Sequence, residues 1–182
     1  MKKTAKSAWP EEVHALLREA GVRQVAIVPD AGHARLIKAC EKDKSMAVVR
    51  LTSEEEGVAL LAGAWLGGEK GVLLMQSSGV GNCINMLTLS IACQFPLLML
   101  VTMRGDHGEF NPAQIPMGNS TQAVLEAMGV IVKRADRAED VTEMVSSAAR
   151  LAFNTYRPVA LLIGQRVFGA KDFRKLTQSV PK

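Results

Sequence analysis

The sequence predicts a single doubly wound α/β domain, built on a mainly parallel sheet of about six strands with helices on both faces. Two observations carry this prediction. Short apolar runs alternate with segments of helical periodicity, and each run is apolar throughout, as in strands that are buried on both faces. Aromatic residues make up only 4% of the 182 residues while hydrophobic residues make up 48%, which favours layered α/β packing over a β-sandwich.

Each element of this fold follows from local signals. Pro10 and the two glutamates after it suit the start of a helix over residues 9–20, and Gly21 suits its end. Apolar runs predict strands over residues 24–28, 46–51, 71–75, 96–103, 130–132 and 158–163. The segments between them predict helices over residues 33–41, 52–66, 82–93, 119–128 and 136–156, and residues 104–117 are expected to form a polar loop.

The charge distribution separates the two ends of the chain from the domain. The net charge is +4, but residues 1–8 and 169–182 are basic tails, so the domain over residues 9–168 is slightly acidic. No basic face with interleaved aromatic residues is present, which argues against nucleic-acid binding. Cys40, Cys83 and Cys93 form no paired motif, so we expect no metal site and no disulfide framework, and a reducing, cytoplasmic location.

One long segment carries no charge. Residues 71–103 would be long enough to span a bilayer, but they include Gln76, Asn82 and Pro96 among other groups that would need partners inside lipid. They therefore predict a strand–helix–strand unit that is buried in the core or against another chain, and no membrane association. The N-terminal residues likewise lack the apolar run of a secretory signal.

Four polar segments are expected to meet at one edge of the sheet, because doubly wound folds bind ligands beyond the carboxyl ends of their strands. They are residues 29–33, 53–57, 76–82 and 104–114. Asp30 or His33, which follow the first strand, is expected to handle protons in a reaction at this edge. A place on the loop surface is the alternative for His33.

Three consecutive glutamates, Glu54, Glu55 and Glu56, begin one of the predicted helices. Because neighbours on a helix diverge by about 100°, at most one of them points into the domain. A carboxylate directed into the uncharged region would be a functional candidate. The alternative is an acidic turn that caps the helix.

Residues 76–82, Gln-Ser-Ser-Gly-Val-Gly-Asn, are expected to form a turn between a strand and a helix. Gly79 and Gly81 permit close approach of a ligand to the backbone, and the start of the helix offers unpaired N–H groups. The turn lacks the third glycine of a dinucleotide fingerprint and the Lys-Ser/Thr of a phosphate-binding loop. A plain tight turn is therefore the alternative.

Together these segments resemble the pyrimidine-binding domain of thiamine diphosphate enzymes. Residues 54–65 look like the family's Glu-x-Gly/Ala-Ala helix and residues 76–82 like its Ser-Gly-x-Gly turn. Residues 95–100 and 112–118 continue the likeness, which extends over residues 10–165. Within the family, the chain is most similar to the alpha subunit of sulfopyruvate decarboxylase, with phosphonopyruvate decarboxylase nearby.

The resemblance implies a cofactor site. When the family motif is laid over Gly57, its glutamate, which hydrogen-bonds N1′ of the aminopyrimidine of thiamine diphosphate, falls on Glu55. The residues of the turn that would also bind the cofactor are Ser78, Gly79, Gly81 and Asn82.

The implied reaction is the decarboxylation of a 2-oxo acid, with sulfopyruvate converted to sulfoacetaldehyde and carbon dioxide. Phosphonopyruvate or another 2-oxo acid, or a carboligation, is the alternative within the family. A non-catalytic binding or regulatory module of the same fold is the alternative from another class. The presence of the glutamate argues against such a module, which has no need of it.

The resemblance also implies a partner. Members of the family hold the diphosphate through Mg²⁺ with a Gly-Asp-Gly segment and a later asparagine, whereas residues 105–108 read Gly-Asp-His-Gly, with no asparagine at the required spacing. A separate beta subunit is therefore expected to supply the diphosphate and Mg²⁺ site in a hetero-oligomer. The uncharged residues 71–103 would meet this subunit, since obligate interfaces are apolar.

Recognition of the small anionic substrate is expected from the same edge of the sheet. A buried anion without a partner is costly, so Arg104 or His107 is expected to contact the sulfonate or carboxylate of the substrate. Gln114 could donate a neutral hydrogen bond. The alternative for Arg104 is a structural ion pair with Asp106 or Glu109.

Overall fold

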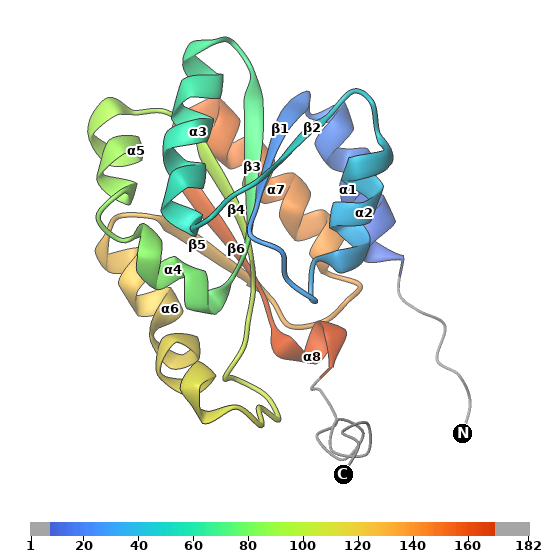
Figure 1. The fold of residues 1–182 in the computed structure, drawn as a ribbon, viewed down its shortest axis with the longest axis vertical. Coiled ribbons are helices and arrows are strands. Elements are labelled where there is room, and N and C mark those ends of the chain that lie inside the picture. The colour runs from blue at the N-terminus through green and yellow to red at the C-terminus, as the bar shows by residue number, and fades with distance from the viewer. Residues whose placement is uncertain (1–7, 170–182) are drawn as a thin grey trace.

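A parallel sheet of six strands runs through residues 8–169, the part of the chain that the computed structural model describes (Figure 1). The strand order is β2-β1-β3-β4-β6-β5, and every neighbouring pair is parallel. The strands are β1 (Val22–Ile27), β2 (Ala47–Arg50), β3 (Lys70–Gln76), β4 (Leu97–Thr102), β5 (Ile131–Ala135) and β6 (Pro158–Ile163). The predicted α/β class is confirmed.

Helices cover both faces of the sheet. One face is covered by α1 (Trp9–Glu19), α2 (Ala34–Lys42) and α7 (Val141–Thr155). The other face is covered by α3 (Glu54–Leu66), α4 (Ser77–Cys83), α5 (Leu87–Cys93) and α6 (Ile115–Ala127). The short η1 (Pro112–Gln114) precedes α6, and α8 (Gln165–Phe168) follows β6 at the carboxyl edge of the sheet.

The sheet separates two hydrophobic cores. Leu98 and Leu100 of β4 point into the core beneath α1, α2 and α7, whereas Met99 and Val101 point into the core beneath α3 to α6. Every residue of β4 and β6 is buried. Burial on both faces is the physical reason why these strands are continuous apolar runs in the sequence.

The segment between β3 and β4 differs from its predicted form. α4 begins directly after the strand, where the sequence predicted a turn, and the single helix predicted over residues 82–93 is divided between α4 and α5. Glycine in a helix costs roughly 0.5–1 kcal/mol relative to alanine. Val80 and Cys83 of α4 are completely buried, so tertiary packing overrides the low helix propensity of the two glycines.

Other boundaries also moved. The polar loop ends earlier than predicted because α6 begins at Ile115, with Pro116 in the first turn, where its missing N–H costs nothing. β5 extends to Ala135, α7 begins only at Val141, and α8 was not predicted. The predicted basic tails lie outside the described residues, apart from Ala8 and Gly169.

The uncharged residues 71–103 form most of β3 together with α4, α5 and β4. Within residues 8–169, no helix combines the length and the apolar character that crossing a membrane requires. The same residues contain no group of three His, Cys, Asp or Glu side chains that is arranged to hold a metal ion. Cys40 and Cys83 are buried free thiols, and burial raises the pKa of each to about 12.

Candidate functional site

The polar segments that follow β1, β3 and β4 lie together at the carboxyl edge of the sheet. Asp30, after β1, accepts hydrogen bonds from Gln76 Nε2 and Thr102 Oγ1, each at 2.7 Å, and these residues end β3 and β4. The backbone N–H of Arg104 donates to Ser77 Oγ at 3.0 Å. Side chains therefore cross-link the ends of three neighbouring strands.

Glu54 is the glutamate that points into the domain. The residue is 7% exposed, and its Oε2 accepts a hydrogen bond from Asn82 Nδ2 at 2.8 Å. Gly79 of α4 lies so close that a β-carbon at this position would overlap the carboxylate. Glu55, on which the family motif places this glutamate, does not take this position, so that expectation is corrected by one residue.

The geometry of α3 explains the correction. Gly57 faces the sheet, because a β-carbon there would lie 2.6 Å from Leu73 and 2.9 Å from Leu51. Residues three apart lie on one face of a helix, whereas residues two apart differ by about 200°. Glu54 therefore shares the inward face of Gly57, and Glu55 does not.

Glu55 and Glu56 lie at the start of α3 and cap the helix, which was the alternative role predicted for the three glutamates. Ser53 Oγ donates a hydrogen bond to the Glu55 carboxylate, and this bond holds the pKa of Glu55 below its usual value. The backbone N–H of Thr52 donates to Glu56 at 2.9 Å. Both carboxylates thus satisfy donors at the beginning of the helix.

The residues of the glycine turn have different surroundings. Gly79 and Asn82 contact Glu54, as described above. Gly81 and Ser78 are exposed; a β-carbon on Gly81 would lie 3.4 Å from Met117 Sδ, and Ser78 Oγ donates to Gln76 Oε1 at 2.9 Å. The structure thus joins two of the four predicted cofactor residues to the buried carboxylate and leaves the other two on the open side of the turn.

Asp30 is a charged residue whose hydrogen bonds connect the ends of β1, β3 and β4. Burial raises its pKa, but hydrogen bonds from Thr102, Gln76 and the N–H of Gly32, together with the nearby His33, outweigh burial, so the pKa of Asp30 is lowered. Both of its oxygens accept hydrogen bonds. Its predicted role in proton transfer stays a prediction.

His33 does not lie at the open edge where the sequence placed it. Its side chain is completely buried, and Nε2 lies 3.0 Å from the carbonyl oxygen of Leu100. Because a carbonyl only accepts, Nε2 carries the proton. Within residues 8–169, Nδ1 has no hydrogen-bond partner, and burial lowers the pKa of the imidazole. The surroundings of His33 are those of a neutral core residue.

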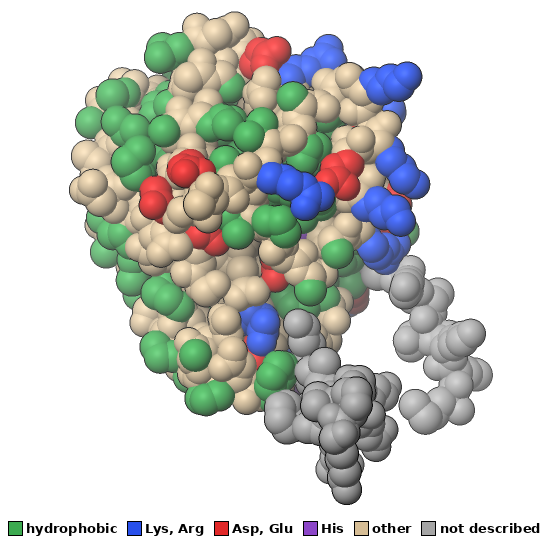
Figure 2. All heavy atoms as spheres, in the orientation of Figure 1, with side chains coloured by type: hydrophobic (Ala, Val, Ile, Leu, Met, Phe, Trp, Pro, Cys, Tyr) green, Lys and Arg blue, Asp and Glu red, His purple; other side chains and the backbone are tan. Residues whose placement is uncertain are grey.

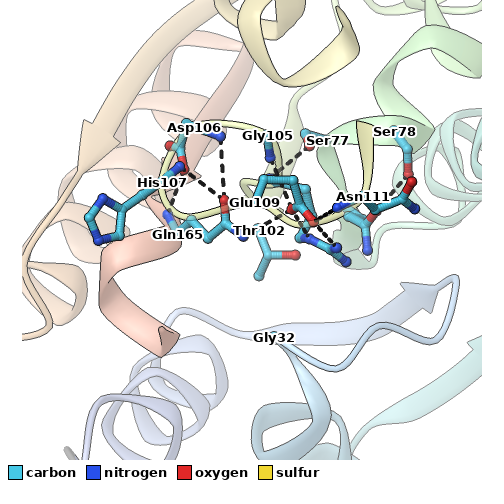
Figure 3. Close-up of polar contacts among 12 residues, drawn as sticks. Gly32, Ser77, Ser78, Thr102, Gly105, Asp106, His107, Glu109, Asn111 and Gln165 are labelled. Carbon is cyan, nitrogen blue, oxygen red and sulfur yellow. Dashed lines mark hydrogen bonds and ion pairs between the residues drawn. The ribbon is translucent and has the colours of Figure 1, made fainter. Parts of the chain in front are cut away.

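A closed network of hydrogen bonds organises the loop after β4 (Figure 3). Glu109 accepts bonds from Arg104 Nε and Nη2 at 2.5 and 2.6 Å, and from the backbone N–H groups of Gly105 and Asn111 at 3.3 and 3.0 Å. Gln165 Nε2, from the start of α8, donates to the same carboxylate at 3.0 Å. Arg104 therefore makes the ion pair that was its structural alternative, and this pair holds the pKa of Glu109 far below its usual range.

Gln165 ties the tip of this loop to the end of β6. Its side chain is buried, and its Oε1 accepts the backbone N–H groups of Asp106 and His107 at 3.3 and 3.1 Å. Asp106 also forms an ion pair with Arg134 of β5. The His107 ring is exposed and points away from this network (Figure 3), and the Oε1 of Gln114 is buried without a partner in the described chain.

A pocket of about 110 Å³ lies beside this network. Its lining residues come from the loop after β1, from Arg104 and from α8 with its flanking glycine, and they are Ala31, Gly32, Arg104, Gln165, Phe168 and Gly169. The pocket therefore lies at the same carboxyl edge as Glu54.

Sequence reasoning missed Glu54, Glu109 and Gln165 as site residues. The spacing of three between Glu54 and Gly57 was a signal for the first. A lone glutamine directly after a continuous apolar strand was a weak signal for Gln165. Glu109 was named only as a possible ion-pair partner of Arg104, and its contact with Gln165 had no local signal, because the two residues lie 56 positions apart in the chain.

The surface over α3 to α6 differs from the surface over α1 and α2. Figure 2 shows mostly hydrophobic and uncharged side chains on the former, whereas Lys and Arg side chains gather on the latter. Leu89, Ile91 and Ile115, from α5 and α6, are exposed. Acidic side chains also lie on this surface, but its exposed apolar side chains suit contact with another protein chain.

The donor set around Glu54 fits the aminopyrimidine of thiamine diphosphate, also called thiamine pyrophosphate. A buried carboxylate can hold a protonated ring nitrogen, and Gly79 leaves the space that this carboxylate occupies. Asn82 keeps one carboxylate oxygen in place. Glu54 and the backbone of the glycine turn would therefore hold the pyrimidine.

The chain matches the family described as thiamine pyrophosphate enzyme, N-terminal TPP binding domain, over residues 11–128. It is 35% identical over 154 residues to the protein named sulfopyruvate decarboxylase subunit alpha of Methanococcus maripaludis, which covers 84% of this chain and 92% of that protein. It is 30% identical over 163 residues to the sulfopyruvate decarboxylase of Methanosarcina acetivorans, which covers 89% of this chain but 41% of that longer protein.

A solved structure shows the same fold. The 2-oxoglutarate:ferredoxin oxidoreductase from Magnetococcus marinus aligns with a TM-score of 0.65 and 16% identity, over 86% of this chain and 28% of that one. At this identity the likeness concerns the fold alone. The family match extends over residues 11–128, and the similarity to an alpha subunit covers nearly its full length. This chain therefore belongs to the thiamine pyrophosphate enzymes, in the family of the sulfopyruvate decarboxylase alpha subunits.

Proposed function

We propose that this chain is the alpha subunit of a thiamine diphosphate-dependent decarboxylase that converts sulfopyruvate to sulfoacetaldehyde and carbon dioxide. The observation that carries the proposal is the buried Glu54 carboxylate beside Gly79, in a chain of which 84% aligns with 92% of a named alpha subunit. A module that had lost the chemistry would have no need for a carboxylate buried in this way, because burying a charge is costly.

When bound, thiamine diphosphate supplies the carbon nucleophile and the electron sink for the loss of carbon dioxide from a 2-oxo acid. Glu54, and not Glu55, would hold a proton at N1′ of the pyrimidine. Asn82 Nδ2 orients the carboxylate for this task, at 2.8 Å from Oε2. Gly79 makes room for the Glu54 carboxylate, and the exposed backbone at Gly81 would allow the ring to approach closely.

A beta subunit would supply the diphosphate and Mg²⁺ site. The similarity to a named alpha subunit supports this, as does the longer M. acetivorans protein, of which this chain covers only 41%. The exposed apolar side chains of α5 and α6 would meet this partner in a hetero-oligomer. The buried free thiols of Cys40 and Cys83 suit the reducing cytoplasm in which we place the complex.

The test combines the chain with a partner that carries the Gly-Asp-Gly segment, in the presence of thiamine diphosphate and Mg²⁺, and measures carbon dioxide release. We expect turnover of sulfopyruvate by the mixture and none by the chain alone. Turnover of phosphonopyruvate but not of sulfopyruvate would assign the alternative substrate. Full activity of the isolated chain would contradict the two-subunit site, and inactivity of every mixture would favour a non-catalytic module.

A further inference from the structure

The pocket beside Arg104 has the size and lining of an anion subsite. Its volume is about 110 Å³, and a single water molecule needs roughly 10–15 Å³ by the same measure, so the few heavy atoms of a sulfonate or carboxylate have room. Ala31 and Phe168 supply apolar walls, and Arg104 and Gln165 supply polar groups. A short aliphatic chain ending in an anion matches this combination.

Arg104 can serve an anion while it is paired with Glu109. A guanidinium has five N–H donors, and Glu109 accepts two of them, one from Nε and one from Nη2. The Phe110 ring lies 5.8 Å from the guanidinium carbon and limits its movement on one side. The ion pair reduces the net charge of the site, so an anion would be recognised by directed hydrogen bonds more than by long-range attraction.

Glu109 and Gln165 keep Arg104 in this orientation. Glu109 is itself held by the backbone of the loop and by Gln165 Nε2, and the Gln165 carbonyl oxygen is held by two backbone N–H groups (Figure 3). Every polar atom of the Gln165 side chain is therefore engaged. A buried, fully bonded network of this kind fixes the geometry of its members.

The carboxylate of Asp30, close to the pocket-lining Gly32, already accepts hydrogen bonds within the protein. Asp30 lies two residues before Gly32, and its oxygens accept hydrogen bonds from Gly32, Gln76 and Thr102. Gly32 lies close against this cluster, since a β-carbon on it would be 2.8 Å from Asp30 Oδ2 and 2.7 Å from the Thr102 methyl group. These bonds offset the repulsion that the Asp30 carboxylate would exert on an incoming anion.

We propose that this pocket binds the second anionic group of the substrate, the sulfonate or phosphonate remote from the 2-oxo acid group, with Arg104 as the donor and with Glu109 and Gln165 as positioning residues. The proposal rests on the proposed function, because it assumes a substrate that carries two anionic groups. Under this proposal, the residues that select the substrate lie in this chain and not in the beta subunit.

The first test compares KM and kcat for sulfopyruvate and pyruvate in the complex of both subunits. We expect Arg104→Met to raise KM for sulfopyruvate by roughly 10–100-fold and Gln165→Met by roughly 3–10-fold, with kcat little changed and pyruvate little affected. Arg150→Met, on the exposed side of α7 across the sheet from the proposed subunit interface, is the matched control and should change neither substrate. Equal losses for both substrates would show that Arg104 and Gln165 are merely structural.

A second variant, Ala31→Glu, tests the proposal without disturbing the hydrogen bonds of Arg104, Glu109 and Gln165. It is needed because substitutions in that network could unfold the loop after β4. Ala31 is exposed and lines the pocket without joining the network, so a carboxylate there should repel a sulfonate and leave the thermal unfolding of the complex unchanged. We expect a KM for sulfopyruvate raised by at least about 10-fold, and a normal KM for pyruvate. An unchanged KM for sulfopyruvate would overturn the proposal.

Direct binding separates this proposal from the proposed function. Calorimetric titration of the complex with sulfoacetate, phosphonoacetate and acetate reports on the subsite without turnover. Binding of the first two that is lost in Arg104→Met supports the subsite even if sulfopyruvate is not decarboxylated. Absence of binding to the unaltered complex, or equal binding to Arg104→Met, would overturn the subsite even if sulfopyruvate is turned over.

Discussion

Two parts of the carboxyl edge place a buried carboxylate in opposite ways. Glu54 is positioned by close packing against Gly79 and by a hydrogen bond from Asn82. Glu109 is positioned by five hydrogen bonds, two from Arg104 and one each from Gly105, Asn111 and Gln165. The site of Glu54 should therefore respond to changes of volume, and the site of Glu109 to changes of charge.

This difference corresponds to the roles that we propose for the two parts. A carboxylate that must bind a ligand cannot use all of its lone pairs within the protein. A carboxylate that only orients an arginine can be fully bonded, and is more rigid for it. The following substitutions test this comparison, beginning with the largest expected effect.

Replacement of Glu54 by Gln should cost the most. The amide keeps the size of the side chain but cannot stabilise a proton on a bound ring nitrogen, so we expect kcat of the complex to fall by roughly 10²–10⁴-fold. Glu55→Gln, which affects only the helix start, should stay within a factor of about 3. A larger loss from Glu55→Gln than from Glu54→Gln in steady-state kinetics would restore the original assignment to Glu55.

Replacing glycine by alanine should change stability in opposite directions at Gly79, which is closely packed, and at Gly63, which has free space beside it. Gly79→Ala places a β-carbon on the Glu54 carboxylate, and such overpacking typically costs about 1–3 kcal/mol of unfolding free energy. Gly63→Ala is the control on α3, since nothing lies within 4 Å of its added carbon, and it should stabilise by about 0.4–1 kcal/mol. Urea unfolding of the purified chain measures both values. Equal effects would mean that Gly79 is not needed for placing Glu54.

The two ion pairs of the loop after β4 should differ in strength. Glu109, with a 3% exposed side chain, loses charge-assisted bonds in Glu109→Gln, which should cost about 1.5–3 kcal/mol. Asp106→Asn weakens the pair with Arg134, whose side chain is 32% exposed, and should cost less than about 1 kcal/mol. Urea unfolding at low and high salt checks both, and only the second loss should shrink with salt. A reversed order would contradict the central place of Glu109.

The last prediction concerns the dependence of stability on pH. The pKa of His33 is lowered by burial, so the folded state disfavours the proton that the unfolded chain accepts near pH 6.5. The stability contributed by neutral His33 is therefore complete above pH 6.5 and is lost as the pH falls through the folded pKa, by at most about 1.4 kcal/mol per pH unit.

His33→Gln should flatten this part of the stability curve, which unfolding measured between pH 7.5 and 5.5 will show. Asp30 and Glu109, whose pKa values are lowered, contribute stability that is lost only below pH 3.8 and 4.5. Their contribution should therefore remain in the His33→Gln variant. An unchanged slope above pH 5.5 in this variant would mean that His33 does not resist protonation.

Several features of the protein followed from the sequence without any coordinates. Continuous apolar runs predicted a parallel sheet covered on both faces, because a strand without a polar side has no face that can be exposed to water. The alternation with helical segments placed Asp30, the three glutamates and the glycine turn at one edge of that sheet. The motifs over residues 54–65, 76–82, 95–100 and 112–118, taken as a set, indicated the family.

The tertiary structure was needed wherever the answer depended on direction or on distant partners. Residues 54–56 are chemically identical in the sequence, and only the packing of Gly57 against Leu73 sets the phase of α3 that turns Glu54 inward. His33 was expected at an open edge, yet its side chain is buried with Nε2 3.0 Å from the Leu100 carbonyl oxygen. Local sequence patterns report the period of a helix or strand, but contacts between residues such as Glu109 and Gln165, 56 positions apart, arise only when the chain has folded.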